Sequence, residues 1–113
     1  AFLNVICSHS VGMLDRFTPQ GISNTVYGMG AVGFRHDRFL REVGAHMQGR
    51  GLHSFDAQHL SNTLYALARL AWSPEGLPDA ICDDIAQRFE AFKPQELSNS
   101  IYALALLREG NPK

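Results

Sequence analysis

Carboxamide and phenol side chains recur at one helical spacing in three places along the chain. In each place an Asn lies four residues after a Gln, and a Tyr lies three residues after the Asn. Positions i, i+4 and i+7 share one face of an α-helix, so each set forms a stripe along its helix. A carboxamide donates and accepts hydrogen bonds, and a phenol ring is a flat surface for stacking. One further position extends each stripe, and the three stripes are Gln20, Asn24, Tyr27 and Ala31; Gln58, Asn62, Tyr65 and Arg69; and Gln95, Asn99, Tyr102 and Leu106.

Two interpretations of these stripes stay open. In the functional one, the amides meet base edges or sugar and phosphate oxygens, and each Tyr stacks on a base. In the structural one, the amides bond to the adjacent helix and each Tyr fills the joint between helices. A joint between helices suits residues that are identical in every copy, whereas discrimination among bases requires positions that vary. The positions that vary are either such discriminators or ordinary solvated positions. The equivalent positions that vary near the same surface are Gly21, His59 and Glu96; Thr18, Asp56 and Lys93; and Ala31, Arg69 and Leu106.

Basic side chains gather in the segment that follows the first stripe. Arg35, Arg38 and Arg41 lie close together there, against only Asp37 and Glu42. They are candidates for phosphate contacts, and a solvated helix face explains them equally well. The matching segment after the second stripe is acidic, which argues against a continuous phosphate track.

The sequence lacks the patterns expected of an enzyme or a metal site. No His pair at i, i+4 spacing has a third ligand, and the Asp83–Asp84 pair has no Gly-rich phosphate loop. We therefore expect no catalytic residue, no cofactor and no metal. Cys7 and Cys82 occupy equivalent positions of the repeat described next, which favours packing over a reactive or paired thiol. Gly28 aligns with alanines in the other copies, and we attribute it to close helix packing.

The stripes belong to a repeat of 37 to 38 residues. Its copies are FTPQGISNTVYGMGAVGF from Phe17, FDAQHLSNTLYALARLAW from Phe55 and FKPQELSNSIYALALLRE from Phe92. Each copy reads as a first helix, and the segments between copies, such as 37–47 and 78–89, have apolar residues at helical spacing. A two-helix unit of this size cannot bury its apolar face alone, so the units must stack.

Local signals indicate where the first helices begin and which face is buried. Thr18 and Asp56 are good N-caps, and Pro19 and Pro94 suit the first helical position. In the second copy, one narrow stripe is predicted to face the core, and it comprises Leu60, Leu64, Leu67 and Ala71.

The predicted fold is all-α, an α-solenoid of stacked two-helix repeats with about five helices. We divide residues 1–113 into a trailing helix of a preceding repeat (1–16), two repeats (17–54 and 55–91) and the leading helix of a further repeat (92–113). Because the array begins and ends within repeats, we expect it to be part of a longer protein, with neighbouring subunits or further repeats covering its ends.

Size and composition exclude further classes of protein. The 113 residues are 45% hydrophobic and carry a net charge of −1, which fits one small ordered domain and excludes a two-domain enzyme. A free-standing nucleic-acid binder usually has a basic excess that this chain lacks. No apolar stretch approaches 18 residues, so we expect no membrane insertion.

The phrases AQHLSNTLYALARL and PQELSNSIYALALL resemble octotricopeptide repeats, and more distantly the repeat arrays of RAP-domain and heptatricopeptide-repeat proteins. This resemblance implies import into a mitochondrion or, alternatively, a chloroplast. It also implies binding of organellar RNA, ribosomal RNA included, in RNA metabolism, translation or an organellar ribosome. The positions that match the family motif are Gln20, Asn24, Tyr27, Gln58, Asn62, Tyr65, Gln95, Asn99 and Tyr102.

Two hypotheses follow for the function. The first is an organellar RNA-binding or RNA-scaffolding helical-repeat protein that acts without catalysis. The alternative is a helical-repeat adaptor that makes only protein–protein contacts, as an accessory subunit of a large organellar complex. RNA or protein lying along the first-helix surface distinguishes the two.

Overall fold

The computed structural model describes residues 2–110, so Ala1 and residues 111–113 of the predicted array lie outside the described range. Within it the chain forms only helices, which confirms the all-α prediction. There are six α-helices rather than about five; a trailing helix, two helix pairs and a leading helix already add up to six, so the expected total was one too low. The α-helices are α1 (Phe2–Ser10), α2 (Pro19–Val32), α3 (Asp37–Arg50), α4 (Ala57–Arg69), α5 (Leu77–Gln87) and α6 (Pro94–Gly110). The short 3-10 helices are η1 (Val11–Arg16), η2 (Leu52–Ser54) and η3 (Phe89–Ala91).

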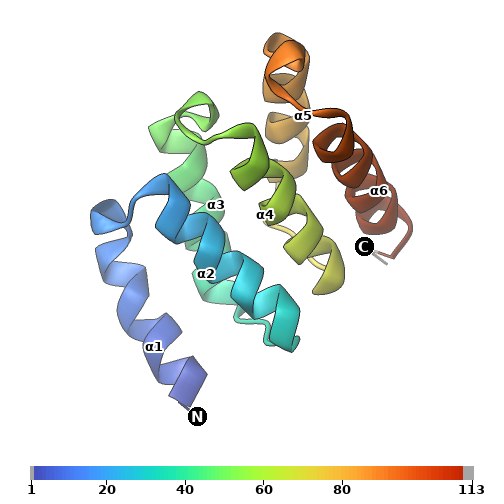
Figure 1. Ribbon diagram of the computed structural model, residues 1–113. Helices are drawn as coiled ribbons and strands as arrows, with labels where there is room; N and C mark the ends of the chain where they lie inside the picture. Colours follow the sequence, from blue (N-terminus) through green and yellow to red (C-terminus); the bar gives the residue numbers. More distant parts are fainter. Residues whose placement is uncertain (1, 111–113) are drawn as a thin grey trace.

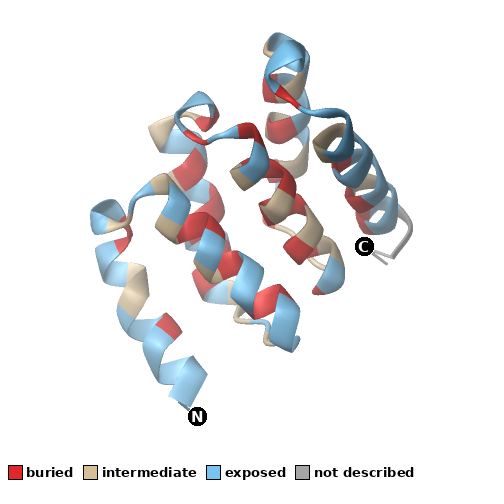
Figure 2. Cartoon of the chain, in the orientation of Figure 1, coloured by how far each residue is buried: buried red, intermediate tan, exposed pale blue. Residues whose placement is uncertain are grey.

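The helices lie in two rows (Figure 1). Helix α4 packs between α2 and α6 in the first row, and α3 contacts both α1 and α5 in the second. The buried residues gather between the rows and between neighbouring helices of the first row (Figure 2). The apolar faces predicted from helical spacing therefore point toward one another, and the opposite faces of α2, α4 and α6 are open to solvent.

The first helices begin close to the predicted residues. The Thr18 hydroxyl accepts the N–H of Gly21 at 3.0 Å, and Pro19 is the first residue of α2. Asp56 has the extended backbone of an N-cap, yet its side chain makes no capping bond. Its carboxylate lies 4.0 Å from the ring of His59 instead, so the prediction for Asp56 is correct for the helix boundary and wrong for the side-chain bond.

The core stripe of α4 is confirmed at three of four positions. Leu60, Leu64 and Leu67 are fully buried. Ala71 is exposed, because α4 ends at Arg69 and Ala71 takes a left-handed backbone conformation with φ of 58°. The chain thus turns away from the helix axis before the stripe can extend by one more turn.

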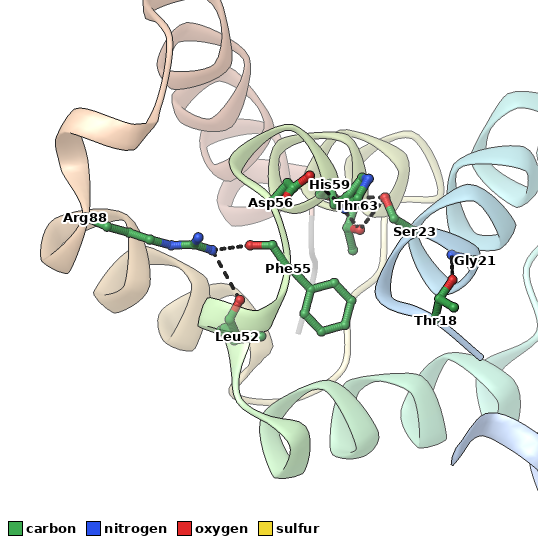
Figure 3. A network of polar contacts seen from close by, with 9 residues as sticks. All are labelled: Thr18, Gly21, Ser23, Leu52, Phe55, Asp56, His59, Thr63 and Arg88. Atoms are coloured by element: carbon green, nitrogen blue, oxygen red, sulfur yellow. Dashed lines mark hydrogen bonds and ion pairs between the residues drawn. The ribbon is translucent and has the colours of Figure 1, made fainter. Parts of the chain in front are cut away.

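The same arginine contact joins the two helices of each complete pair, α2 with α3 and α4 with α5. Arg50, at the end of α3, donates from Nη2 to the Phe17 carbonyl at 2.9 Å. Arg88, just after α5, donates to the Phe55 carbonyl, and also to the Leu52 carbonyl at 3.2 Å (Figure 3). In both pairs the arginine lies 33 residues after the phenylalanine. The second helix of a unit therefore fixes the start of its own first helix.

Close packing of the first row depends on Gly30 rather than on Gly28. A Cβ added at Gly30 would lie 2.8 Å from Cα of Ala66, whereas one added at Gly28 would meet nothing within 4 Å. The packing role predicted for Gly28 is wrong because Gly28 faces away from α4. Its counterparts Ala66 and Ala103 are buried, and Ala66 lies beside Gly30 of the preceding helix in the row, whereas within residues 2–110 no helix precedes α2 in that row.

Leu64 and Ile101 occupy the same repeat position, but Leu64 is 0% exposed and Ile101 is 67% exposed. We expect Leu64→Ala to lower the free energy of unfolding by about 2–5 kcal/mol, since it leaves a cavity in the core. Ile101→Ala should change it by no more than about 0.5 kcal/mol. Urea denaturation followed by circular dichroism measures both, and equal losses would contradict the assignment of buried and exposed faces.

Alanine substitutions at Gly30 and Gly28 should change the stability of the fold in opposite directions. Gly30→Ala forces α2 and α4 apart and should destabilise the fold by about 1–3 kcal/mol. Gly28→Ala places a methyl group in open space within a helix and should stabilise it by about 0.5–1 kcal/mol. The midpoint of thermal unfolding should fall for the first variant and rise for the second. A stabilised Gly30→Ala protein would show that the two helices are not in close contact there.

Candidate functional site

The three predicted stripes come to lie on one surface. They run along α2, α4 and α6, which are neighbours in the first row (Figure 1), and they lie on the helix faces opposite the buried residues. Seven of the nine Gln, Asn and Tyr residues are exposed, and the two on the central helix, Asn62 and Tyr65, are half-buried. We call this the amide surface, and it comprises Gln20, Asn24, Tyr27, Gln58, Asn62, Tyr65, Gln95, Asn99 and Tyr102.

The serine before Asn24 and the serine before Asn62, rather than these Asn residues themselves, bond to the adjacent helix. Ser23 Oγ donates to the His59 carbonyl at 3.0 Å (Figure 3), and Ser61 Oγ donates to the Glu96 carbonyl at 3.2 Å. Within residues 2–110 the amides of the surface make no side-chain hydrogen bond. The structural interpretation thus fits the serines, which our sequence analysis did not select although Ser recurs in every copy. The amide groups keep their donors and acceptors for a ligand.

Two tyrosines and an arginine line a shallow hollow between α2 and α4. Its volume is about 210 Å³, and its lining includes Tyr27, Tyr65, Ala66 and Arg69. Arg69 Nε donates to the Gly30 carbonyl at 3.2 Å, and its guanidinium carbon lies 5.9 Å from the centre of the Tyr65 ring. The arginine is therefore held across the joint, where its charge interacts with the face of an aromatic ring. A flat ligand that enters this hollow meets aromatic and cationic groups together.

The basic cluster is divided between two places. Arg35, in the loop between α2 and α3, pairs with Asp37 at 2.7 Å and lies 5.5 Å from the centre of the Trp72 ring. The hydrogen bond from Arg35 holds the pKa of the Asp37 carboxyl below its usual value. Arg38 and Arg41 are exposed on α3, which belongs to the second row. The structure thus brings neither Arg38 nor Arg41 onto the amide surface.

Several of the variable positions serve the helix starts. Glu96 Oε1 accepts the backbone N–H of Lys93 at 2.8 Å, which closes the first turn of α6 as Thr18 closes that of α2. Ala31 and Arg69 lie at the other end of their helices and line the hollow with the tyrosines. Among the variable positions, these two are therefore placed to influence what binds beside Tyr27 and Tyr65.

The cysteines differ in their surroundings. Cys7 is buried, and burial raises the pKa of its thiol; Cys82 is exposed at its residue surface, and partial desolvation together with the carboxylates of Asp79 and Asp83 raises the pKa of its thiol. Both therefore remain largely protonated at neutral pH. The described residues include no group of three His, Cys, Asp or Glu side chains arranged to hold a metal ion.

Comparisons with protein-family models, with curated proteins and with solved structures found no match to this chain. In the part of the chain that the structure describes, no helix has both the length and the apolar character needed to cross a membrane. The repeat and the geometry of the amide surface are therefore the basis for a functional proposal.

The neighbouring residues Ser61 and Asn62 allow a direct test of which one holds the joint. Ser61→Ala loses a buried hydrogen bond to α6 and should cost about 1 kcal/mol of unfolding free energy. Asn62→Ala should change stability by no more than about 0.5 kcal/mol, since the amide has no partner to lose. Ser98→Ala, at the exposed third copy of the serine, is the matched control and should be neutral. A large loss of unfolding free energy in Asn62→Ala would support the structural interpretation of the amides instead.

Proposed function

We propose that this protein is an α-solenoid of two-helix repeats that binds single-stranded RNA along the amide surface. One observation carries the proposal. Three parallel stripes of amide and phenol groups face solvent with their hydrogen-bonding groups unused, while other residues hold the helices together. Side chains that recur without a structural partner are available for a ligand that itself repeats.

The recurrence of contacts from unit to unit supports the solenoid. The same serine bonds the same carbonyl position in the α2–α4 and α4–α6 joints. The arginine contacts of Arg50 with Phe17 and of Arg88 with Phe55 also repeat. In a solenoid each unit touches only its neighbours through such equivalent contacts.

The chemistry of the surface favours unpaired bases. Amides bond to base edges, and aromatic rings stack on base faces, which are accessible in single strands but not inside a duplex. The net charge of −1 means that phosphate neutralisation contributes less than in a basic protein. Arg35, Arg38 and Arg41 add positive potential to the first repeat and favour the approach of a strand. At one nucleotide per unit, three stripes contact about three nucleotides, as repeat proteins do.

The compartment is part of the same proposal and rests on the resemblance of the repeat phrase to octotricopeptide repeats. We propose a mitochondrion, with a chloroplast as the alternative. There the protein would act in RNA metabolism or translation, or as a component of an organellar ribosome. A short array fits a role in which the RNA contact is shared with neighbouring subunits.

Fluorescence anisotropy with labelled random-sequence single-stranded RNA tests the RNA contact. We expect Asn24→Ala, Asn62→Ala and Asn99→Ala together to weaken binding about a hundredfold, because each lost amide contact is worth about 1 kcal/mol. The matched control removes two exposed amides outside the surface, with Asn4→Ala and Gln87→Ala, and should leave the affinity unchanged.

Equal binding by the triple variant and the control would show that RNA does not use the amide surface. Absence of RNA binding by the unmodified protein, together with a protein partner cross-linked at position 58, would favour the adaptor hypothesis instead. A benzophenone amino acid placed at Gln58, on the central helix, reports which class of macromolecule covers the surface in its native assembly.

A further inference from the structure

The hollow between α2 and α4 differs in one important residue from the corresponding joint between α4 and α6. Arg69 lines the hollow from α4. In the third copy of the repeat, Leu106 on α6 occupies the position of Arg69. Both joints have a tyrosine on each of their two helices, but the second has an aliphatic side chain where the first has a guanidinium. The contribution of this arginine to recognition is therefore specific to the α2–α4 hollow.

Neutral groups hold Arg69 in place and leave its positive charge uncompensated. Its Nε donates to the Gly30 carbonyl at 3.2 Å, and its guanidinium carbon lies 5.9 Å from the centre of the Tyr65 ring. Within residues 2–110 no carboxylate pairs with Arg69, and its two Nη nitrogens donate no hydrogen bond. The N–H donors of a guanidinium lie in one rigid plane. With Nε occupied, the two Nη groups form a fork of donors whose position is set by the protein.

The hollow has room for one flat base. Its volume of about 210 Å³ lies below the roughly 300–1,000 Å³ of pockets that take drug-sized ligands. Ala31 and Ala66 contribute only small side chains to its lining. Tyr27 lines it from α2 and is 46% exposed, so its ring is open to stacking. A base that stacks on Tyr27 in this hollow therefore lies beside the donors of Arg69 on the other helix.

We propose that this hollow selects guanine in the bound RNA strand and that Arg69 determines the selection. Guanine carries two acceptors, O6 and N7, on one edge, and a fork of arginine donors bonds to both. Adenine offers a similar surface for stacking but presents an N6 donor beside N7, and arginine has no acceptor to meet that donor. The inference rests on the proposed function and adds to it a preference for one base at one joint.

Fluorescence anisotropy with short labelled oligouridylates tests this preference. The strands differ only in one central nucleoside, which is guanosine in one strand and adenosine in the other. We expect the guanosine strand to bind about tenfold more tightly, which is the lower part of the range for a bidentate pair because Arg69 is exposed. The ratio of the two affinities is the readout, since a loss of general RNA affinity changes both values together.

Modified nucleosides at the central position identify the edge of the base that is bound. Inosine keeps both O6 and N7, so it should bind like guanosine. 7-Deazaguanosine lacks the N7 acceptor, so it should lose most of the preference over adenosine. The reverse order would overturn the assignment, because it would indicate recognition through the N2 amino group that inosine lacks.

Two substitutions at Arg69 separate its charge from its geometry. Arg69→Lys keeps the positive charge but replaces the fork by one ammonium group, so the guanosine preference should disappear while binding of the adenosine strand is retained. Arg69→Leu introduces the side chain of the third copy and should also abolish the preference. Arg38→Lys, at an exposed position of α3, is the matched control and should leave the preference unchanged. If Arg69→Leu alters the circular dichroism spectrum, Arg69→Lys alone decides.

The stacking role of Tyr27 has a separate expected effect. Tyr27→Ala should weaken binding of the guanosine and adenosine strands by a similar factor, about tenfold, because stacking tolerates any base. The ratio of the two affinities should therefore stay the same. A Tyr27→Ala protein that binds both strands as tightly as the unmodified protein would show that the base does not occupy this hollow.

Equal binding of the guanosine and adenosine strands by the unmodified protein overturns the inference, and so does a preference that survives Arg69→Lys. If both strands bind equally and the triple Asn variant weakens both, the proposed function stands without the base preference. If neither strand binds, the proposed function fails and the inference fails with it. Free guanosine monophosphate that binds as tightly as the guanosine strand would also overturn it, since the ligand would then be a nucleotide rather than RNA.

Discussion

The joint between neighbouring first helices is the constraint on which the rest of the structure depends. A serine hydroxyl that donates to the carbonyl of the next helix fixes the register, and the missing side chain of Gly30 lets α2 approach Ala66 of α4 closely. Small groups and backbone atoms make most of the joint, and Arg69 bonds across it near one end, so the amides are not needed there. Asn24 and its counterparts are thereby left on the open side of the row, all in the same orientation.

The joint also explains why one face of the first row can carry exposed polar side chains while the opposite face packs into the core. Residues near the axis between the rows, such as Leu60 and Leu64, are fully buried, and those half a turn away are open to solvent. A ligand on the amide surface would therefore contact the protein without opening the core. The fold supplies spacing and orientation, and on the proposed function the chemistry of recognition would come from the exposed side chains.

Much of the fold was predictable because the same sequence pattern, and with it the same predicted helix, occurs three times. Helical spacing located the first helices, and the buried leucines of α4 followed from it. The sequence could not distinguish Ser61 from Asn62 as the joint residue, since both recur and lie about 100° apart on the helix, so the choice depends on where the neighbouring helix lies. Nor could it place the end of α4 before Ala71, where no Gly or Pro marks the turn. Nor does helical spacing report that Phe89 is 59% exposed, since exposure depends on which helices pack beside a residue.

The arginine contact that closes each helix pair has a consequence for how the chain acquires its structure. The Phe55 carbonyl accepts a hydrogen bond from the guanidinium of a residue 33 positions later in the chain. This contact cannot form until the second helix of the pair has been synthesised. Once that helix is present, closure needs no distant part of the chain. The contact therefore closes a loop short enough to form rapidly, while the apolar face of each unit is buried only when the next unit stacks on it.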